Sequence, residues 1–294
     1  MTKPRRIIKG KTYMLTRRCT QRSLFLKPSP AVNQLILYCL ALAAERKGVF
    51  VHAFMVLGNH YHLIVTDPDR QVPDFMHDMN MLIAARLNAH YGRSENFWKV
   101  GSYSAVELIE RNDILAKIVY ALQNPVAAGL VSTYEQWPGA FSRPKEMLGS
   151  ERVIERPKAF FSERSSLPEV VTLTFYPPPN VGCEERFVAD VEGVLAAVEA
   201  QHRERMFSSG GRFLGRRGVL AQRHTDQPQS EEEESDINPR VACGDKWKRI
   251  ETLRGLQAFY EAHEQARLRL KAGETPVEFP EGTYRRRGRA RLAG

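Results

Sequence analysis

Hydrophobic positions along the first 130 residues recur with two different periods, one typical of strands and one typical of helices, in successive segments of the chain. Alternating or short continuous apolar runs predict strands, and they lie at residues 12–18, 49–57, 60–66 and 102–109. Spacings of three and four predict helices, and they lie at residues 31–47, 72–91 and 112–123. The order β-α-β-β-α-β-α is typical of a ferredoxin-like antiparallel sheet with helices on one face. The pattern therefore predicts an α+β fold.

The second half of the chain has a different pattern. Prolines are frequent from residue 143 onward, and helical spacing returns at residues 184–206 and 245–272. We therefore expect three parts: a domain over 1–142, a Pro-rich linker over 143–183, and a mostly helical accessory region over 184–294. Within the last part, an acidic segment over 225–240 is expected to be disordered, and the chain ends in an Arg-rich tail.

Composition places the chain among ordinary globular proteins. Of 294 residues, 43% are hydrophobic and 26% are charged. No apolar run reaches the roughly 18 residues of a membrane span. The four cysteines stand far apart without a CxxC pair, which argues against a disulfide framework. We therefore expect a cytoplasmic protein without a membrane partner.

Positive charge is concentrated in the N-terminal half. Residues 1–148 hold 19 Lys+Arg and 11 Asp+Glu, and the first 27 residues hold nine basic groups and no acidic one. This distribution favours a polyanionic partner, most simply nucleic acid, over a solubilising surface, and it suggests association with the nucleoid. The candidate DNA-binding residues are Arg5, Arg6, Lys9, Lys11, Arg17, Arg18 and Trp98. The basic ones could hold phosphates, whereas Trp98 could stack on a base or pack in the core.

Two histidines interrupt the apolar run "MVLGNHYHLIV". Side chains alternate across a strand, so His60 and His62 share one face while Tyr61 points to the other. Their backbones would lie roughly 7 Å apart, which lets both imidazoles reach one divalent ion. The alternative is a pair of histidines on an exposed sheet face.

A second motif is "YALQNPVAAGLV". Tyr120 and Asn124 are four residues apart and share one face of the predicted helix, whereas Gln123 is a rival amide at a less favourable angle. Pro125 lacks a backbone N–H, so we expect the helix to kink or restart there. The alternative is a core tyrosine followed by a proline break.

Together the motifs resemble the single-tyrosine HUH transposases, most closely the REP-associated tyrosine transposases. The resemblance covers about residues 10–142 and rests on "GNHYH", "FWKVGSYSAVEL" and "YALQNPVAAGLV" in this order. It implies that His60 and His62 bind Mg²⁺ or Mn²⁺, and that Asn124 is a third ligand where related enzymes often have glutamine. It also implies that Tyr120 is the nucleophile, which forms a 5′-phosphotyrosine.

The same resemblance implies the partner. Family members cleave and rejoin single-stranded DNA beside a hairpin with a short guide sequence, as monomers or homodimers. No DxD or DDE-like triad suggests another chemistry. Two alternatives stay open: a domesticated, catalytically silent protein that binds hairpin DNA, and an unrelated ferredoxin-like RNA-binding module.

Overall fold

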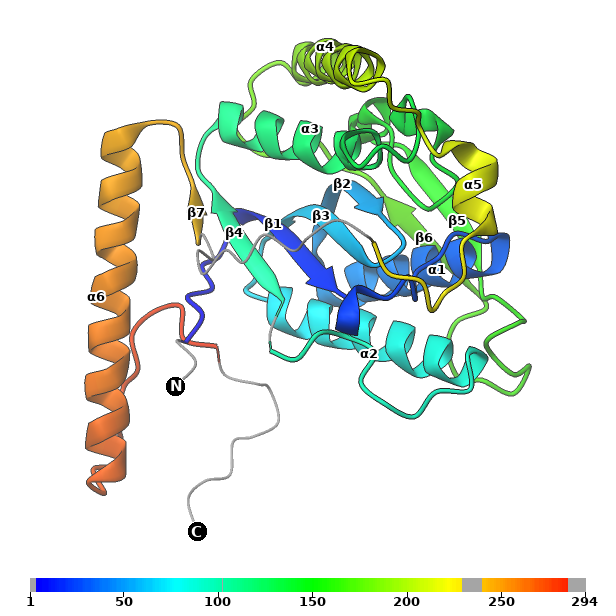
Figure 1. Ribbon diagram of the computed structural model, residues 1–294. Coiled ribbons are helices and arrows are strands. Elements are labelled where there is room, and N and C mark those ends of the chain that lie inside the picture. Colours follow the sequence, from blue (N-terminus) through cyan, green and yellow to red (C-terminus); the bar gives the residue numbers. More distant parts are fainter. Residues whose placement is uncertain (1–3, 102, 229–239, 285–294) are drawn as a thin grey trace.

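The computed structural model describes residues 4–101, 103–228 and 240–284, and it has the expected α+β class (Figure 1). A five-stranded sheet has the order β2-β3-β1-β4-β7. Its strands are β1 (Lys11–Arg18), β2 (Phe50–Val56), β3 (His60–Asp67), β4 (Ser104–Leu108) and β7 (Val241–Ala242). β1 pairs antiparallel with β3 and β4, whereas β7 pairs parallel with β4. The sheet is therefore mixed, and the expectation of a purely antiparallel sheet was wrong because a distant segment adds to its edge.

Helices cover both faces of this sheet rather than one. α1 (Pro30–Lys47) and α2 (Val72–His90) pack on one face, and α3 (Arg111–Ala127) and α4 (Glu184–Ser208) lie over the other (Figure 1). The reason is visible in β1, where Leu15 belongs to the first core and Met14 to the second. A sheet that is apolar on both faces must be covered on both. The expectation of helices on a single face was therefore wrong, and α3 lies over the histidine face.

The first helix shows how local sequence sets an element's ends. The Ser29 hydroxyl accepts a hydrogen bond from the Val32 N–H at 3.1 Å, and Pro30 occupies the first turn. Gly48 ends the helix in the left-handed region, with φ of 63°. Between these ends the helix is buried over most of its surface.

The Pro-rich stretch 143–183 explains that burial. It contains a two-stranded sheet of β5 (Glu151–Glu155) and β6 (Val170–Thr174), which packs against α1. Buried side chains from it, Ile154 and Leu173 among them, join the first core. The stretch therefore folds onto the N-terminal domain, while the domain boundaries themselves stay a prediction.

α3 does not stop at its proline. The helix continues through Pro125 to Ala127, so the expected end at Gln123 and restart at Pro125 were wrong. Proline removes one intrahelical hydrogen bond, but Pro125 and Val126 are buried in the second core. Backbone bonds from Ala128 N–H to the Asn124 carbonyl and from Leu130 N–H to the Pro125 carbonyl close the end. Packing thus outweighs the lost bond, and Asn124 stays on a regular helix.

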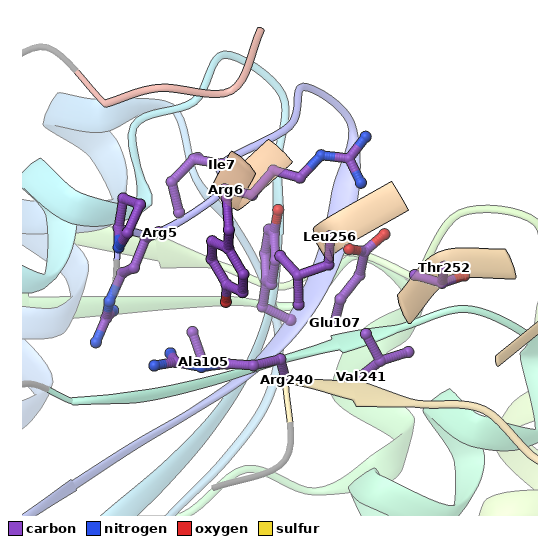
Figure 2. Close-up of a pocket in the computed structure, with 12 residues that line it drawn as sticks. Arg5, Arg6, Ile7, Ala105, Glu107, Arg240, Val241, Thr252 and Leu256 are labelled. Carbon is purple, nitrogen blue, oxygen red and sulfur yellow. The ribbon is translucent and has the colours of Figure 1, made fainter. Parts of the chain in front are cut away.

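The remaining elements connect the C-terminal part to residues 4–10, the N-terminal arm that precedes β1. α5 (Gly215–Ala221) follows α4, and α6 (Lys246–Lys271) lies beyond the β7 edge (Figure 1). The Ile7 N–H donates to the Gly282 carbonyl at 2.9 Å, and a small cavity of about 30 Å³ lies between the arm, β4 and α6 (Figure 2). Short 3₁₀ turns are found at Thr20–Arg22, Tyr134–Gln136 and Pro144–Leu148.

Parts of the accessory region lie outside the described residues. They include most of the acidic segment, at 229–239, and the Arg-rich tail at 285–294. Within the described ranges, no helix is both long and apolar enough to cross a membrane.

Candidate active site

β3 brings the two histidines together on the face that α3 covers. The ring centroids of His60 and His62 are 4.9 Å apart, with the rings at 82°. His62 is 4% exposed and lies opposite Thr16 of β1 in the antiparallel register. The two histidines therefore do not lie on an exposed sheet face, which was the alternative interpretation of the motif.

Hydrogen bonds orient both imidazoles. The Asn59 side-chain amide donates to the Arg22 carbonyl, so its oxygen faces His60 and accepts from His60 Nδ1 at 2.7 Å. His62 Nδ1 lies 2.8 Å from the Thr16 hydroxyl and His62 Nε2 lies 3.2 Å from the Asn124 amide nitrogen; with the amide in this orientation, Nε2 accepts and Nδ1 donates. Both imidazoles are thus held through Nδ1, and Nε2 offers the lone pair.

Burial keeps both imidazoles neutral. It lowers the pKa of His60 to about 4, and the nearby Arg18 charge adds to this effect. Burial also lowers the pKa of His62 well below its ordinary value, helped by His60 and Lys117. A neutral imidazole is the form that binds a metal ion. Near neutral pH the pair is therefore ready to ligate without losing a proton.

α3 places Tyr120 and Asn124 over this pair. The Tyr120 ring lies 5.4 Å from the His62 ring and is 44% exposed. The Lys117 ammonium lies 5.3 Å from the Tyr120 ring centroid, one turn earlier on the same helix. An exposed hydroxyl beside a buried imidazole pair is accessible to a large substrate. Two imidazoles, a carboxamide and a phenol therefore converge from two elements that are far apart in sequence.

The rival groups point elsewhere. The Gln123 side-chain oxygen accepts a hydrogen bond from His202 Nε2 of α4 at 2.6 Å. His202 is therefore half-buried against α3. Tyr61 is 1% exposed, and its hydroxyl donates to Asn80 Oδ1 at 2.7 Å. Burial raises the pKa of Tyr61, which suits a core residue and not a nucleophile.

A large cavity of about 1010 Å³ adjoins the site, and His60 and Asn124 line one side of it. Among its described lining residues are the cations Arg18, Arg22 and Lys27, and the acidic residue Asp226. The excess of positive charge suits a phosphate-bearing ligand. Of the DNA-binding candidates read from the sequence, Arg18 is the one that lines this cavity.

The other candidates have structural partners. The Arg5 guanidinium stacks 3.4 Å from the Tyr103 ring centroid, and Arg6 lines the small cavity beneath α6. Trp98 is 9% exposed, and its indole N–H donates to the Asn80 carbonyl at 3.0 Å. These contacts favour packing over base stacking for Trp98.

The remaining three candidates lie closer to the surface. Lys9 forms an ion pair with Asp69 at 2.9 Å, and Lys11 forms one with Glu107 at 3.1 Å. Arg17 donates to the Gly101 carbonyl at 2.8 Å. Exposed ion pairs are weak, so these cations can still exchange partners with a phosphate.

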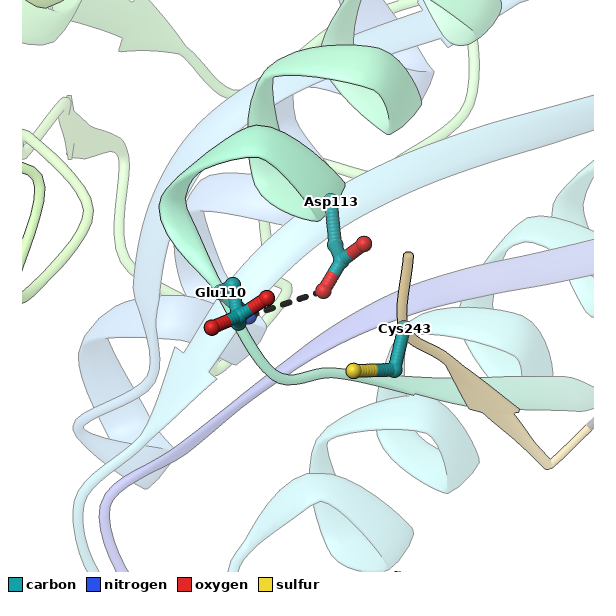
Figure 3. A group of neighbouring side chains, drawn as sticks. All are labelled: Glu110, Asp113 and Cys243. Atoms are coloured by element: carbon teal, nitrogen blue, oxygen red, sulfur yellow. Dashed lines mark hydrogen bonds between the residues drawn. The ribbon is translucent and has the colours of Figure 1, made fainter. Parts of the chain in front are cut away.

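A second group of potential metal ligands consists of Glu110, Asp113 and Cys243 (Figure 3). Its carboxylates already serve the backbone: Asp113 accepts from the N–H groups of Glu110 and Gly244 at 2.9 and 2.8 Å. Glu110 also pairs with Lys248. Burial raises the pKa of the Cys243 thiol, which keeps it protonated. The group is therefore the cap that joins α3 to the β7 strand, and we do not assign a metal to it.

Three residues of the site were not identified from the sequence: Thr16, Asn59 and Lys117. Thr16 lies two positions after Met14 on β1, so both side chains point to the same face of the sheet. The β1–β3 pairing shows that this is the face of the histidines. Asn59 precedes the motif and looked like a turn residue only. Lys117 lies three positions before Tyr120, a helical spacing that places both on one face.

Two solved structures illustrate what this chain is similar to. One is a REP-associated tyrosine transposase bound to a REP hairpin, with 21% identity, a TM-score of 0.42, and coverage of 50% of this chain and 86% of that chain. The other is a candidate transposase from Deinococcus radiodurans, with 22% identity, a TM-score of 0.30, and coverage of 42% and 97%.

Both similar structures are described as transposases, the class that the motifs had indicated, and the overlap spans about half of this chain. No protein-family model and no curated protein matches the sequence. Because both TM-scores lie below 0.5, the functional conclusion below rests on the side chains of the site.

Proposed function

We propose that this protein is a metal-dependent DNA transposase of the single-tyrosine type, which cleaves and rejoins one DNA strand next to a hairpin. One observation carries the proposal: two neutral imidazoles, the Asn124 amide and the half-exposed Tyr120 ring converge, and His60 and Asn124 also line a cavity with an excess of cations. In this reading, strands β1 to β4 with their helices form the ferredoxin-like core of the catalytic domain.

The residues present fit a divalent ion. His60 and His62 would hold it through Nε2, since Asn59 and Thr16 occupy Nδ1. Asn124 would hold it through its oxygen, which a half-turn of the amide exchanges with the nitrogen now facing His62. When bound, Mg²⁺ or Mn²⁺ polarises a phosphate oxygen and stabilises the charge that develops on it.

Tyr120 supplies the nucleophile in this proposal. Its oxygen attacks phosphorus, the new tyrosine O–P bond forms, and the P–O3′ bond breaks. The phenol loses its proton, and the departing 3′ oxygen gains one. The phosphodiester energy stays in the 5′-phosphotyrosine, so a second 3′-OH can reverse the step and join a new strand. Lys117, close to the Tyr120 ring, is placed to offset negative charge on the approaching phosphate.

One chain supplies all four side chains of the candidate site. His60 and His62 come from β3, and Tyr120 and Asn124 from α3 of the same molecule. We therefore propose a site that is completed in cis, within one molecule. Hairpin DNA is the substrate that we propose to test first, because a REP hairpin is bound to the similar transposase structure.

The test is trapping of a covalent complex. We expect single-stranded hairpin DNA and Mn²⁺ to give a protein–DNA adduct that survives denaturation, with the nucleotide on the peptide that contains Tyr120. Tyr120→Phe should fold and bind DNA but form no adduct, while the matched control Tyr61→Phe should retain it. An adduct on any other tyrosine would refute the assignment. Binding without any adduct, across several hairpins, would favour a catalytically silent hairpin-binding protein.

A further inference from the structure

A segment of the accessory region crosses the mouth of the candidate site. We call residues 212–228, which include α5, the strap. At one end, just after α3, the Leu214 N–H donates to the Gly129 carbonyl at 2.9 Å. The Gly215 N–H donates to the Leu130 carbonyl at 2.9 Å. At the other end, the Asp226 carbonyl accepts from the Leu24 N–H at 3.1 Å. The strap is therefore tied on both sides of the large cavity.

The strap gives that cavity one of its walls. Leu214, Gln222 and Asp226 line it from the strap, opposite Arg22 and Lys27 of the loop that precedes α1. Figure 1 shows α5 and the coil after it running from the side of α4 toward the side of α2. Because both ends are attached, the strap holds its position along one side of the cavity. A flexible single strand can follow such a confined surface more easily than a rigid duplex.

A second cavity, of about 410 Å³, lies beyond the first. Tyr91, Arg223 and His224 line it. Lys27 and Gln222 line both cavities, so the two meet at these side chains. The two cavities are therefore neighbours, with Lys27 and Gln222 between the side of His60 and Asn124 and the end of α2.

The second cavity is lined by a flat aromatic pair. The His224 ring of the strap lies parallel to the Tyr91 ring, with centroids 4.2 Å apart and planes at 4°. Phe25 lies behind the pair, 6.3 Å from Tyr91 and 6.5 Å from His224. Neither Tyr91 nor His224 is fully buried. Such a pair offers a π-face, on which any nucleobase can stack.

We infer that the strap and the Lys27 loop form a channel for single-stranded DNA that leads to the candidate active site, and that Tyr91 and His224 stack on an unpaired base at its far end. The inference rests on the proposed function only in the identity of the ligand as DNA. Along the channel the cations Arg18, Arg22, Lys27 and Arg223 face Asp226, which gives the charge balance that phosphates require.

Binding measured without catalysis tests the channel separately from the chemistry. In a Tyr120→Phe background with EDTA, fluorescence anisotropy would give the affinity for a labelled single strand and for its duplex. We expect the single strand to bind more tightly. His224→Ala should weaken that binding at least about fivefold, the factor that corresponds to roughly 1 kcal/mol per stacked base. His224→Phe, which keeps a stacking ring, should restore it.

The phosphate contact has its own readout. Lys27→Ala should reduce the slope of log affinity against log salt by about one, because one phosphate contact is lost. Arg217 is exposed on α5 and lines neither cavity, so Arg217→Ala is the matched control and should bind as the parent does. Equal effects of the Lys27 and Arg217 substitutions would overturn the channel.

Photochemical crosslinking provides a measurement that does not depend on variants folding normally. A single strand carrying 5-iodouracil should crosslink to the peptide that contains Tyr91 or to the one that contains His224. Crosslinks confined to other surfaces would overturn the inference, and tighter binding of RNA of the same sequence would overturn DNA as the occupant. If an adduct forms on Tyr120 while the channel variants bind normally, the proposed function stands and the channel fails. If the channel variants lose single-strand binding while no adduct forms on Tyr120, the channel stands and the proposed function fails.

Discussion

Thr16→Val tests whether the hydrogen bond to His62 Nδ1 prepares the metal site. The Thr16 hydroxyl and His62 Nδ1 are 2.8 Å apart across the β1–β3 pair. Valine keeps the β-branched shape and removes only the hydroxyl. His62 would then lose the partner that holds its Nδ1 proton and its ring orientation. We therefore expect the variant to fold and to bind the metal weakly.

The size of the effect follows from two separate terms. A lost hydrogen bond, with the His62 N–H left partly unsatisfied, should lower the free energy of unfolding by about 1–2 kcal/mol. Loss of a partner that orients a ligating imidazole typically costs about 10- to 100-fold in metal affinity. The second term, worth roughly 1.4–2.7 kcal/mol, concerns metal binding alone.

The assay is Mn²⁺ titration by calorimetry, combined with thermal unfolding of the metal-free protein. Thr12→Val is the matched control: Thr12 lies on the same face of the same strand, and its hydroxyl bonds to Thr66 Oγ1 at 2.8 Å. The control should lose a similar amount of stability and keep its Mn²⁺ affinity. Wild-type Mn²⁺ affinity in Thr16→Val would refute the role of Thr16, as would an equal loss of affinity in both variants.

Three further outcomes follow from the structure. Burial lowers the pKa of His52 to about 4 from the ordinary 6.5 of the unfolded chain, so the unfolded chain binds the proton first as the pH falls. The free energy of unfolding should therefore decrease between pH 6.5 and pH 4, by up to about 3 kcal/mol. Denaturant unfolding of His52→Gln should show a correspondingly weaker pH dependence. Asn124→Ala should weaken Mn²⁺ binding at least roughly tenfold while Asn124→Asp strengthens it through the added charge, and calorimetry showing neither change would remove Asn124 from the ligand set. Arg18→Ala should lower the salt slope of DNA binding by about one, whereas Arg5→Ala, which removes a cation stacked on Tyr103, should lower the melting temperature and leave that slope unchanged.

Local patterning was enough to predict the helices and strands up to α3 and the residues of the two motifs, whereas β5, β6, α5 and β7 were not predicted. Alternation along β3 placed His60 and His62 on one face and Tyr61 on the other, and Tyr61 is indeed buried in the core opposite. The four-residue spacing of Tyr120 and Asn124 placed both on one helix face. These inferences succeed because strand and helix periods are properties of a few consecutive residues. The α+β class follows from the same periods read in order.

Pairing between distant segments was decided only by the folded chain. Helix α3 lies over the histidine face because both faces of the sheet are apolar, and its packing carries the helix through Pro125. The Nδ1 partners of the histidines come from Asn59 and from Thr16, whose position opposite His62 depends on the register of β1 and β3. No local period encodes that register. It is set by burying the whole sheet at once.

The accessory region shows the same limit. Helical spacing predicted α4 and α6, but nothing in the sequence placed the strap across the cavity or set His224 against Tyr91. Gln123 and Asn124 are adjacent amides in sequence, and contact with His202 of α4 separates their roles. Composition and period therefore predicted most of the helices and strands and the residues of the candidate site. Tertiary packing decided which side chains meet, because that choice depends on free energies summed over contacts between residues far apart in the chain.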